Sequence, residues 1–293
     1  MTKPRATLIG FVAVLLWALL ALFTVFTAPM PPLQLNAVCF AIGGAIGVIW
    51  IVSTGGIGRL RWVPWYVYVF GTTGLFGYHF LYFSALRAAP AAEAGLIAYL
   101  WPLLIVLFSG LLPGERLRAG HVIGAAISFA GAALVVLGGA TGFDPAHLAG
   151  YLLAGGCALT WSGYSVLSRG LGRIPTESVA VFCILTAALS LLAHLSLEQT
   201  VWPATNLGWG AMLALGLGPV GLAFYVWDIG VKQGDIQILG VASYAAPLLS
   251  TLALIVAGVA QPRWSLLLAA ALVAGGALLA ARASRSLAET PQA

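Results

Sequence analysis

Apolar residues occur in this chain in runs of about 20, separated by short connectors rich in Gly, Pro and charged residues. A helix of that length rises about 30 Å, which is the thickness of the hydrocarbon core of a bilayer. Strands of membrane β-barrels alternate apolar and polar residues in segments of only about 10, so the runs favour helices. The pattern predicts an all-α integral membrane protein with ten transmembrane helices. They are expected at about residues 8–27, 33–53, 63–86, 91–112, 120–139, 148–168, 178–197, 207–231, 236–257 and 265–283.

Composition supports a membrane protein and removes other classes. Hydrophobic residues make up 61% of the chain and charged residues 7%, whereas soluble domains carry roughly a quarter charged residues. A soluble enzyme, a disordered tail and a nucleic-acid-binding protein are therefore excluded, and no nucleic-acid partner is expected. Cys39, Cys157 and Cys183 lie inside apolar runs without Cys-x-x-Cys spacing. We interpret them as packing residues, and we expect no disulfide, metal or cofactor.

The basic residues predict an orientation in the membrane. With the amino terminus in the cytoplasm, only Arg87 and Arg263 of the 13 basic residues lie outside, in agreement with the positive-inside rule. We therefore expect a multi-pass protein of the cell inner membrane, surrounded by lipid, with both termini cytoplasmic. The basic residues expected inside are Lys3, Arg5, Arg59, Arg61, Arg116, Arg118, Arg169, Arg173, Lys232, Arg282 and Arg285.

The two halves of the chain resemble each other. A shift of 145 positions aligns residues 99–104 with 244–249 and places Arg87 on Lys232, and a shift of 144 places Trp17 on Trp161. Because each half has an odd number of predicted spans, the second copy enters the membrane from the opposite face. The sequence thus predicts two inverted five-helix repeats, residues 1–140 and 141–293. Such repeats are common in secondary transporters, where they support alternating access.

These features resemble a known family. The ten-span plan, the Trp17 and Trp161 pair and the Gly114-Glu115 dipeptide are similar to the EamA group of the drug/metabolite transporter superfamily. Residues 77–83 and 99–102 resemble a branch of bacterial inner-membrane exporters of aromatic amino acids. The resemblance implies a secondary transporter that exports aromatic and other neutral amino acids with broad specificity. In the second half Ala260-Gln261 replaces the Gly-Glu dipeptide, so any role of that pair is not expected there.

Two prolines are candidates for the substrate site. Pro102 and Pro247 each lie 11 residues into a predicted span, close to mid-membrane. Proline frees the carbonyl four residues earlier, which is Ala98 in one span and Ser243 in the other. Free carbonyls at that depth need protein, water or ligand as partners, so we expect them to accept hydrogen bonds from a substrate ammonium. A kink that only shapes helix packing is the alternative.

Aromatic and polar side chains on the same spans are further candidates. Tyr and Trp within a span carry polar groups that need partners, and their rings can stack on a substrate, although ordinary helix packing is the alternative. His79 is a candidate for a substrate contact or a proton carrier, because the reference pKa of histidine is about 6.5; a neutral packing histidine is the alternative. The aromatic candidates are Tyr78, Tyr82, Tyr99, Trp101, Trp161, Tyr164, Tyr225, Trp227 and Tyr244.

Charged residues near the span ends have simpler interpretations. Asp228 and Lys232 are four apart and favour a local helical ion pair, with a gate or a substrate contact as the alternative. We expect Glu93 to complement the start of its helix or to pair with Arg87. His194 and Glu198, at an outer span end, are expected to be solvated. Glycines at 43 and 47, and at 120 and 124, predict close helix packing.

Other functions remain as alternatives. A related exporter of nucleosides or cationic drugs is the closest rival. The chain has no Walker A, His-Glu-x-x-His or Gly-x-Ser-x-Gly motif, which argues against ATP-driven transport and an intramembrane enzyme. It also has no polar stripe or charged ring typical of a channel. The sequence does not determine the preferred substrate, the coupling ion, the resting conformation or the oligomeric state, for which a monomer is the working expectation.

Overall fold

A computed structural model describes residues 1–137, 142–171 and 174–288, and these residues form helices and connecting loops without a strand. The helices of the first half are α1 (Lys3–Ala18), α2 (Leu20–Phe26), α3 (Pro32–Ser53), α4 (Ile57–Leu60), α5 (Trp65–Thr72), η1 (Thr73–Gly77), α6 (Tyr78–Ala88), α7 (Ala91–Ala98), α8 (Trp101–Ser109) and α9 (Ala119–Leu137). Those of the second half are η2 (Pro145–His147), α10 (Leu148–Gly170), α11 (Ser178–Leu197), α12 (Asn206–Leu217), η3 (Gly218–Leu222), α13 (Ala223–Gln233), α14 (Ile236–Ala242), α15 (Ala245–Val256) and α16 (Ser265–Ala288).

Eight helical segments of the described chain are long and apolar enough to cross a membrane. They are Lys3–Phe26, Pro32–Ser53, Ala91–Ser109, Ala119–Leu137, Ser178–Leu197, Asn206–Gln233, Ile236–Val256 and Ser265–Ser284. They coincide with eight of the ten predicted spans. The other two correspond to α10 and to the segment from α5 to α6. Both are helical, but they carry more hydroxyl and aromatic side chains, which lowers their mean hydropathy.

Several predicted spans are interrupted rather than continuous. Two five-residue π-helical segments, η1 and η3, begin and end 145 positions apart (73 to 218 and 77 to 222). A turn at Tyr99 and Leu100 separates α7 from α8, and one at Ser243 and Tyr244 separates α14 from α15. Each turn directly precedes a helix with proline at its second or third residue, Pro102 or Pro247. The irregularities therefore recur at equivalent positions of the two halves.

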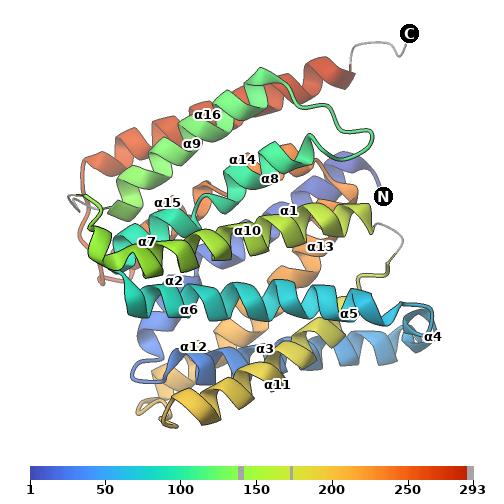
Figure 1. The fold of residues 1–293 in the computed structure, drawn as a ribbon, viewed down its shortest axis with the longest axis vertical. Helices are drawn as coiled ribbons and strands as arrows, with labels where there is room; N and C mark the ends of the chain where they lie inside the picture. The colour runs from blue at the N-terminus through green and yellow to red at the C-terminus, as the bar shows by residue number, and fades with distance from the viewer. Residues whose placement is uncertain (138–141, 172–173, 289–293) are drawn as a thin grey trace.

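The helices run roughly parallel to one another in stacked layers (Figure 1). The α9 and α16 pair forms one outer layer, and α3, α11 and α12 lie at the opposite side. Between them, α10 packs against α6, α7, α8 and α13, which makes it a central element. The start of α1, the end of α16 and the short α4 share one end of the bundle (Figure 1).

Small residues allow the closest helix contacts, as the glycine spacing predicts. A Cβ atom on Gly124 of α9 would lie 2.5 Å from the carbonyl oxygen of Gly276 on α16. A Cβ atom on Gly47 of α3 would overlap the Tyr225 hydroxyl of α13. The three cysteines are buried and free, in agreement with a packing role. Large apolar side chains such as Ile49 are exposed on the outside of the bundle, where lipid would cover them.

Candidate functional site

Four tryptophans from four helices meet at the centre of the bundle and form what we call the tryptophan cluster. Trp17 lies on α1, Trp101 on α8, Trp161 on α10 and Trp227 on α13. All six ring pairs are in contact, with centroid distances from 5.1 Å for Trp17 and Trp227 to 6.4 Å for Trp101 and Trp161. Trp101, Trp161 and Trp227 are buried. Helices far apart in sequence thus contribute to one aromatic centre.

Hydrogen bonds hold two of these indoles in place. The Trp17 Nε1–H donates to the carbonyl oxygen of Pro219 at 3.1 Å, within the π-helical segment η3. The Trp227 Nε1–H donates to Ser165 Oγ at 3.1 Å. Buried indole N–H groups need such partners. The irregular backbone of η3 therefore supplies an acceptor that orients an indole of the cluster.

A second aromatic layer on α6 adjoins the cluster. The rings of Tyr78 and Tyr82 are stacked, with centroids 6.2 Å apart and an interplanar angle of 4°. Tyr78 also contacts Trp161, at a centroid distance of 5.4 Å. Trp161 in turn contacts Tyr164 at 5.2 Å. The predicted residues of α6, α8, α10 and α13 are thus brought together around Trp161.

His79 lies in this aromatic environment. Its Nδ1 is 2.8 Å from the carbonyl oxygen of Leu75, within the π-helical segment η1. Its ring packs edge-on against Phe40 at 5.0 Å and contacts Phe224 at 6.1 Å. No described residue forms a hydrogen bond with the other ring nitrogen. His79 therefore has one nitrogen committed to the backbone.

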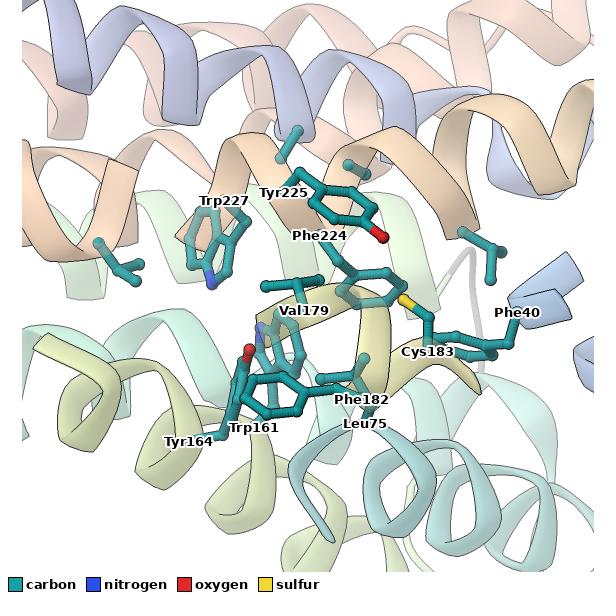
Figure 2. Close-up of a cluster of buried hydrophobic side chains, with 14 of the residues drawn as sticks. Phe40, Leu75, Trp161, Tyr164, Val179, Phe182, Cys183, Phe224, Tyr225 and Trp227 are labelled. Carbon is teal, nitrogen blue, oxygen red and sulfur yellow. The ribbon is translucent and has the colours of Figure 1, made fainter. Parts of the chain in front are cut away.

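Phe224 and Phe40 are site residues that the sequence reasoning missed. The Phe224 ring stacks on Phe40 at 5.2 Å and lies 5.7 Å from the ring of Trp161. Figure 2 labels these three side chains. A signal for Phe224 existed, since it precedes Trp227 by three residues and shares its helix face. Phe40 stands in a continuous apolar run and offers no such signal. Trp17 entered the sequence argument as the repeat partner of Trp161 and in the family resemblance, but not as a site residue.

Tyr225 and Tyr244 lie apart from the tryptophan cluster, and their hydroxyls are engaged. The Tyr225 hydroxyl donates to the Gly43 carbonyl at 2.9 Å, and in Figure 2 its ring points away from Trp227. The Tyr244 hydroxyl accepts the N–H of Leu103 at 3.0 Å, just beyond the break between α7 and α8. Tyr99, which a shift of 145 positions aligns with Tyr244, lies at that break.

The two proline breaks differ at the carbonyl four residues before the proline. The expectation that Pro247 leaves the Ser243 carbonyl free is wrong, because the Ala246 N–H donates to it at 3.0 Å. The turn tightens there to an i to i+3 bond, which replaces the bond that proline removes. At the other break Pro102 has no N–H to offer the Ala98 carbonyl. Pro102 also lies close to α14, since a Cβ atom on Gly240 would be 3.1 Å from its carbonyl oxygen.

Asp228 and Lys232 form a buried ion pair, as their spacing predicts. The Lys232 Nζ is 2.9 Å from the Asp228 carboxylate and donates to the Ile174 carbonyl at 3.0 Å. The Thr176 hydroxyl donates to the same carboxylate at 2.7 Å. The side chains of the pair are only 1% and 5% exposed. The pair therefore connects α13 to the chain between α10 and α11.

At the opposite end of the bundle, Glu198 is a buried carboxylate, although the sequence analysis expected it to be solvated. Arg87 pairs with Glu198 at 2.6 Å and not with Glu93. Glu198 also accepts the N–H groups of Leu33 and Gln34 at the start of α3. The expectation of a solvated Glu198 and His194 is wrong, because their side chains are 3% and 2% exposed and bond each other at 3.0 Å. The unpaired amides of a helix start account for this burial, since they attract a carboxylate.

The glutamate of the Gly114-Glu115 dipeptide also makes a specific contact. Glu115 forms an ion pair with Arg169 at the end of α10. Arg169 donates in addition to the carbonyls of Val231 and Gly234, at 2.8 and 2.9 Å. One guanidinium thus connects the ends of α10 and α13 to the loop after α8. Lys3 pairs with Asp235 nearby at 3.5 Å, which joins the start of α1 to the same end.

The chain matches known transporters over nearly its whole length. The EamA-like transporter family model matches residues 4–137 and 148–282. A protein of Ancylobacter novellus named aromatic amino acid exporter YddG is 57% identical, and the match covers 97% of this chain and 100% of that protein. Proteins of the same name from Salmonella typhimurium and Escherichia coli are 29% and 28% identical, with coverage of 86% and 97% of this chain and 88% and 99% of theirs. A crystal structure with 55% identity superposes with a TM-score of 0.92 and covers 97% of this chain and 99% of its own.

Proposed function

This chain belongs to the EamA-like transporter family, and we propose that it exports aromatic and other large neutral amino acids across the bacterial inner membrane by alternating access. It is a multi-pass transporter and not an enzyme. The observation that carries the substrate assignment is the aromatic centre around Trp161, in a chain 57% identical to a protein named as an exporter of aromatic amino acids.

The proposed substrate site lies between the tryptophan cluster and the stacked tyrosines of α6. Aromatic faces favour an aromatic or large apolar side chain through offset stacking and burial. An ammonium group is attracted to the negative faces of the same rings and to backbone carbonyls near Pro102. We assign substrate contacts to Tyr78, His79, Tyr82, Tyr99, Trp101, Pro102, Trp161, Tyr164 and Trp227.

The remaining candidates receive supporting roles in this proposal. Tyr225, Tyr244 and Pro247 shape the helices behind the site, because both hydroxyls are bound to backbone groups. The rings of the tryptophan cluster contact one another, so a substrate that stacks on them would replace ring contacts with its own. A site made of stacking surfaces and backbone acceptors discriminates weakly between side chains, which favours broad specificity.

The same proposal includes ten transmembrane helices in two inverted five-helix repeats, residues 1–140 and 141–293. The π-helical segments and the two prolines recur 145 positions apart, and the turns before the prolines recur 144 positions apart. These recurrences support a duplication. At about 1.5 Å per residue, α10 with 23 residues is long enough to cross the bilayer. Both termini are assigned to the cytoplasm, supported by the common end of α1 and α16. A single chain contains both repeats, so a monomer suffices.

Transport by the purified protein in liposomes tests the function. Uptake of labelled phenylalanine would be measured beside leucine, a nucleoside and a cationic drug, with and without a pH gradient. We expect saturable phenylalanine uptake that leucine competes. A response to the gradient would assign proton coupling, for which His79 is the first candidate. Uptake of only the nucleoside or the drug would overturn the amino-acid assignment while leaving the family unchanged.

A further inference from the structure

A small cavity lies beside the buried ion pair of Asp228 and Lys232. Both charged side chains line it, and the rest of its wall is mostly apolar. The apolar lining residues are Val67, Phe70, Leu171, Ile174 and Phe182. The cavity as described has room for about one water molecule. Two opposite charges and an apolar wall thus occur at one place inside the bundle.

The apolar wall is continuous with the proposed substrate site. The ring of Phe70 stacks on Tyr164, with centroids 5.5 Å apart and an interplanar angle of 28°. Tyr164 in turn contacts Trp161 at 5.2 Å, and Figure 2 shows Phe182 beside these rings. A side chain that enters the cavity therefore meets aromatic surface that leads to the tryptophan cluster.

Because the pair is buried, its charges discriminate strongly between ligands of different charge. A buried ion pair adds little net stability, but removal of one partner is costly because it leaves an uncompensated charge. An incoming ligand that separates the pair must therefore supply both charges. A zwitterion does so, since its carboxylate can replace Asp228 on Lys232 and its ammonium can replace Lys232 on Asp228. No buried charge is then left unpaired.

We propose that Asp228 and Lys232 form a second site, adjoining the aromatic centre, that binds the ammonium and carboxylate groups of a zwitterionic amino acid, whose side chain there lies against Phe70 and Tyr164. This inference rests on the proposed amino-acid transport and assigns a specificity that the aromatic site lacks. Backbone carbonyls and aromatic faces attract any ammonium, whether or not a carboxylate accompanies it. Lys232 supplies the cation that a carboxylate requires, so amines and carboxylic acids that carry one charge are rejected.

Competition experiments in liposomes test the proposal with ligands that differ only in charge. Inhibition of labelled phenylalanine uptake would be measured with phenylalanine, phenylethylamine and 3-phenylpropionate. The wild type should prefer phenylalanine over either singly charged analogue by at least about tenfold, because each leaves one buried charge unpaired. In the Lys232→Met variant, phenylethylamine should compete better than phenylalanine. In the Asp228→Asn variant, 3-phenylpropionate should compete better than phenylalanine.

Two further variants separate recognition from folding. Asp228→Asn with Lys232→Met leaves no unpaired charge, so the protein should fold, and its preference for phenylalanine should fall to within about threefold. Lys3→Met breaks the pair between the half-exposed Lys3 and Asp235 at the same end and should keep the wild-type preference. A double variant with unchanged preference would overturn the inference and leave amino-acid transport intact. A wild type that moves no amino acid would overturn the proposed function itself.

Discussion

The backbone N–H of Leu103 donates to the Tyr244 hydroxyl at 3.0 Å, and this bond joins two interrupted helices that are 141 positions apart in sequence. Leu103 follows Pro102, in the first turn of α8, and Tyr244 lies in the turn before α15. The first N–H groups of a helix lack intrahelical acceptors. Tyr244 satisfies one of them from the second half of the chain, and its ring packs on Phe129 of α9.

Tyr244→Phe should therefore lower stability without removing apolar surface. The partly buried N–H of Leu103 would lose its acceptor, at a cost of about 1–3 kcal/mol. The measurement is the melting temperature of the purified protein in detergent. Tyr99→Phe is the matched control, because the Tyr99 hydroxyl makes no hydrogen bond to the described residues. Equal melting temperatures for both variants would contradict a role for the Tyr244 bond.

Tyr82→Ala should weaken the transport of aromatic substrates more than that of leucine. Tyr82 stacks on Tyr78, and offset aromatic pairs contribute about 0.5–1.5 kcal/mol beyond area burial. The half-saturation concentration for phenylalanine should rise about twofold to tenfold. Tyr151→Ala, which removes a ring that packs on Phe143 instead, is the control. A loss of the same size for leucine would argue against stacking.

Gly124→Ala should destabilise the contact between α9 and α16. The added Cβ atom would lie 2.5 Å from the Gly276 carbonyl oxygen, so the two helices must move apart. Overpacking of this kind costs about 1–3 kcal/mol. Gly155→Ala on α10 meets no atom within 4 Å and should not lower the melting temperature. A Gly124 variant as stable as the Gly155 variant would show that this contact tolerates a methyl group.

Glu198→Gln should destabilise the protein more than substitution of an exposed carboxylate. The change removes the charge that Arg87 and His194 face and that the start of α3 binds. Loss of one partner of a buried ionic contact costs about 3–5 kcal/mol, and the half-exposed Arg87 places the expected value at the lower end. Asp144→Asn, at an exposed cap of η2, is the comparison. Denaturation in detergent measures both.

The proposed orientation can be measured with single cysteines that react with a membrane-impermeant reagent. With Cys39, Cys157 and Cys183 replaced by alanine, Ser53→Cys should be protected in intact cells and Thr200→Cys should be labelled. The reason is that the basic residues concentrate at the end that holds α4. The reverse labelling pattern would invert the orientation and also the direction assigned to export.

The sequence determined much of the architecture, because hydrophobicity, proline and charge act locally along the chain. Runs of about 20 apolar residues predict spanning helices whatever their neighbours are. The prolines at 102 and 247 lie beside helix breaks that the structure has, since proline removes an N–H wherever it stands. The spacing of Asp228 and Lys232 was enough to predict their pair.

Only the tertiary structure decided which of these side chains meet. Phe224 rather than Tyr225 faces Trp161, because a rotation of about 100° per residue separates neighbouring faces of a helix. The Ser243 carbonyl is satisfied by a tighter turn, and Glu198 is buried by amides of α3. Glu198 and Leu33 are 165 positions apart, and Phe224 and Trp161 lie on different helices. A local pattern holds no information about how such helices pack. For that reason the sequence by itself predicted the helices and the ion pair of Asp228 and Lys232, whereas packing alone created the aromatic centre and the burial of Glu198.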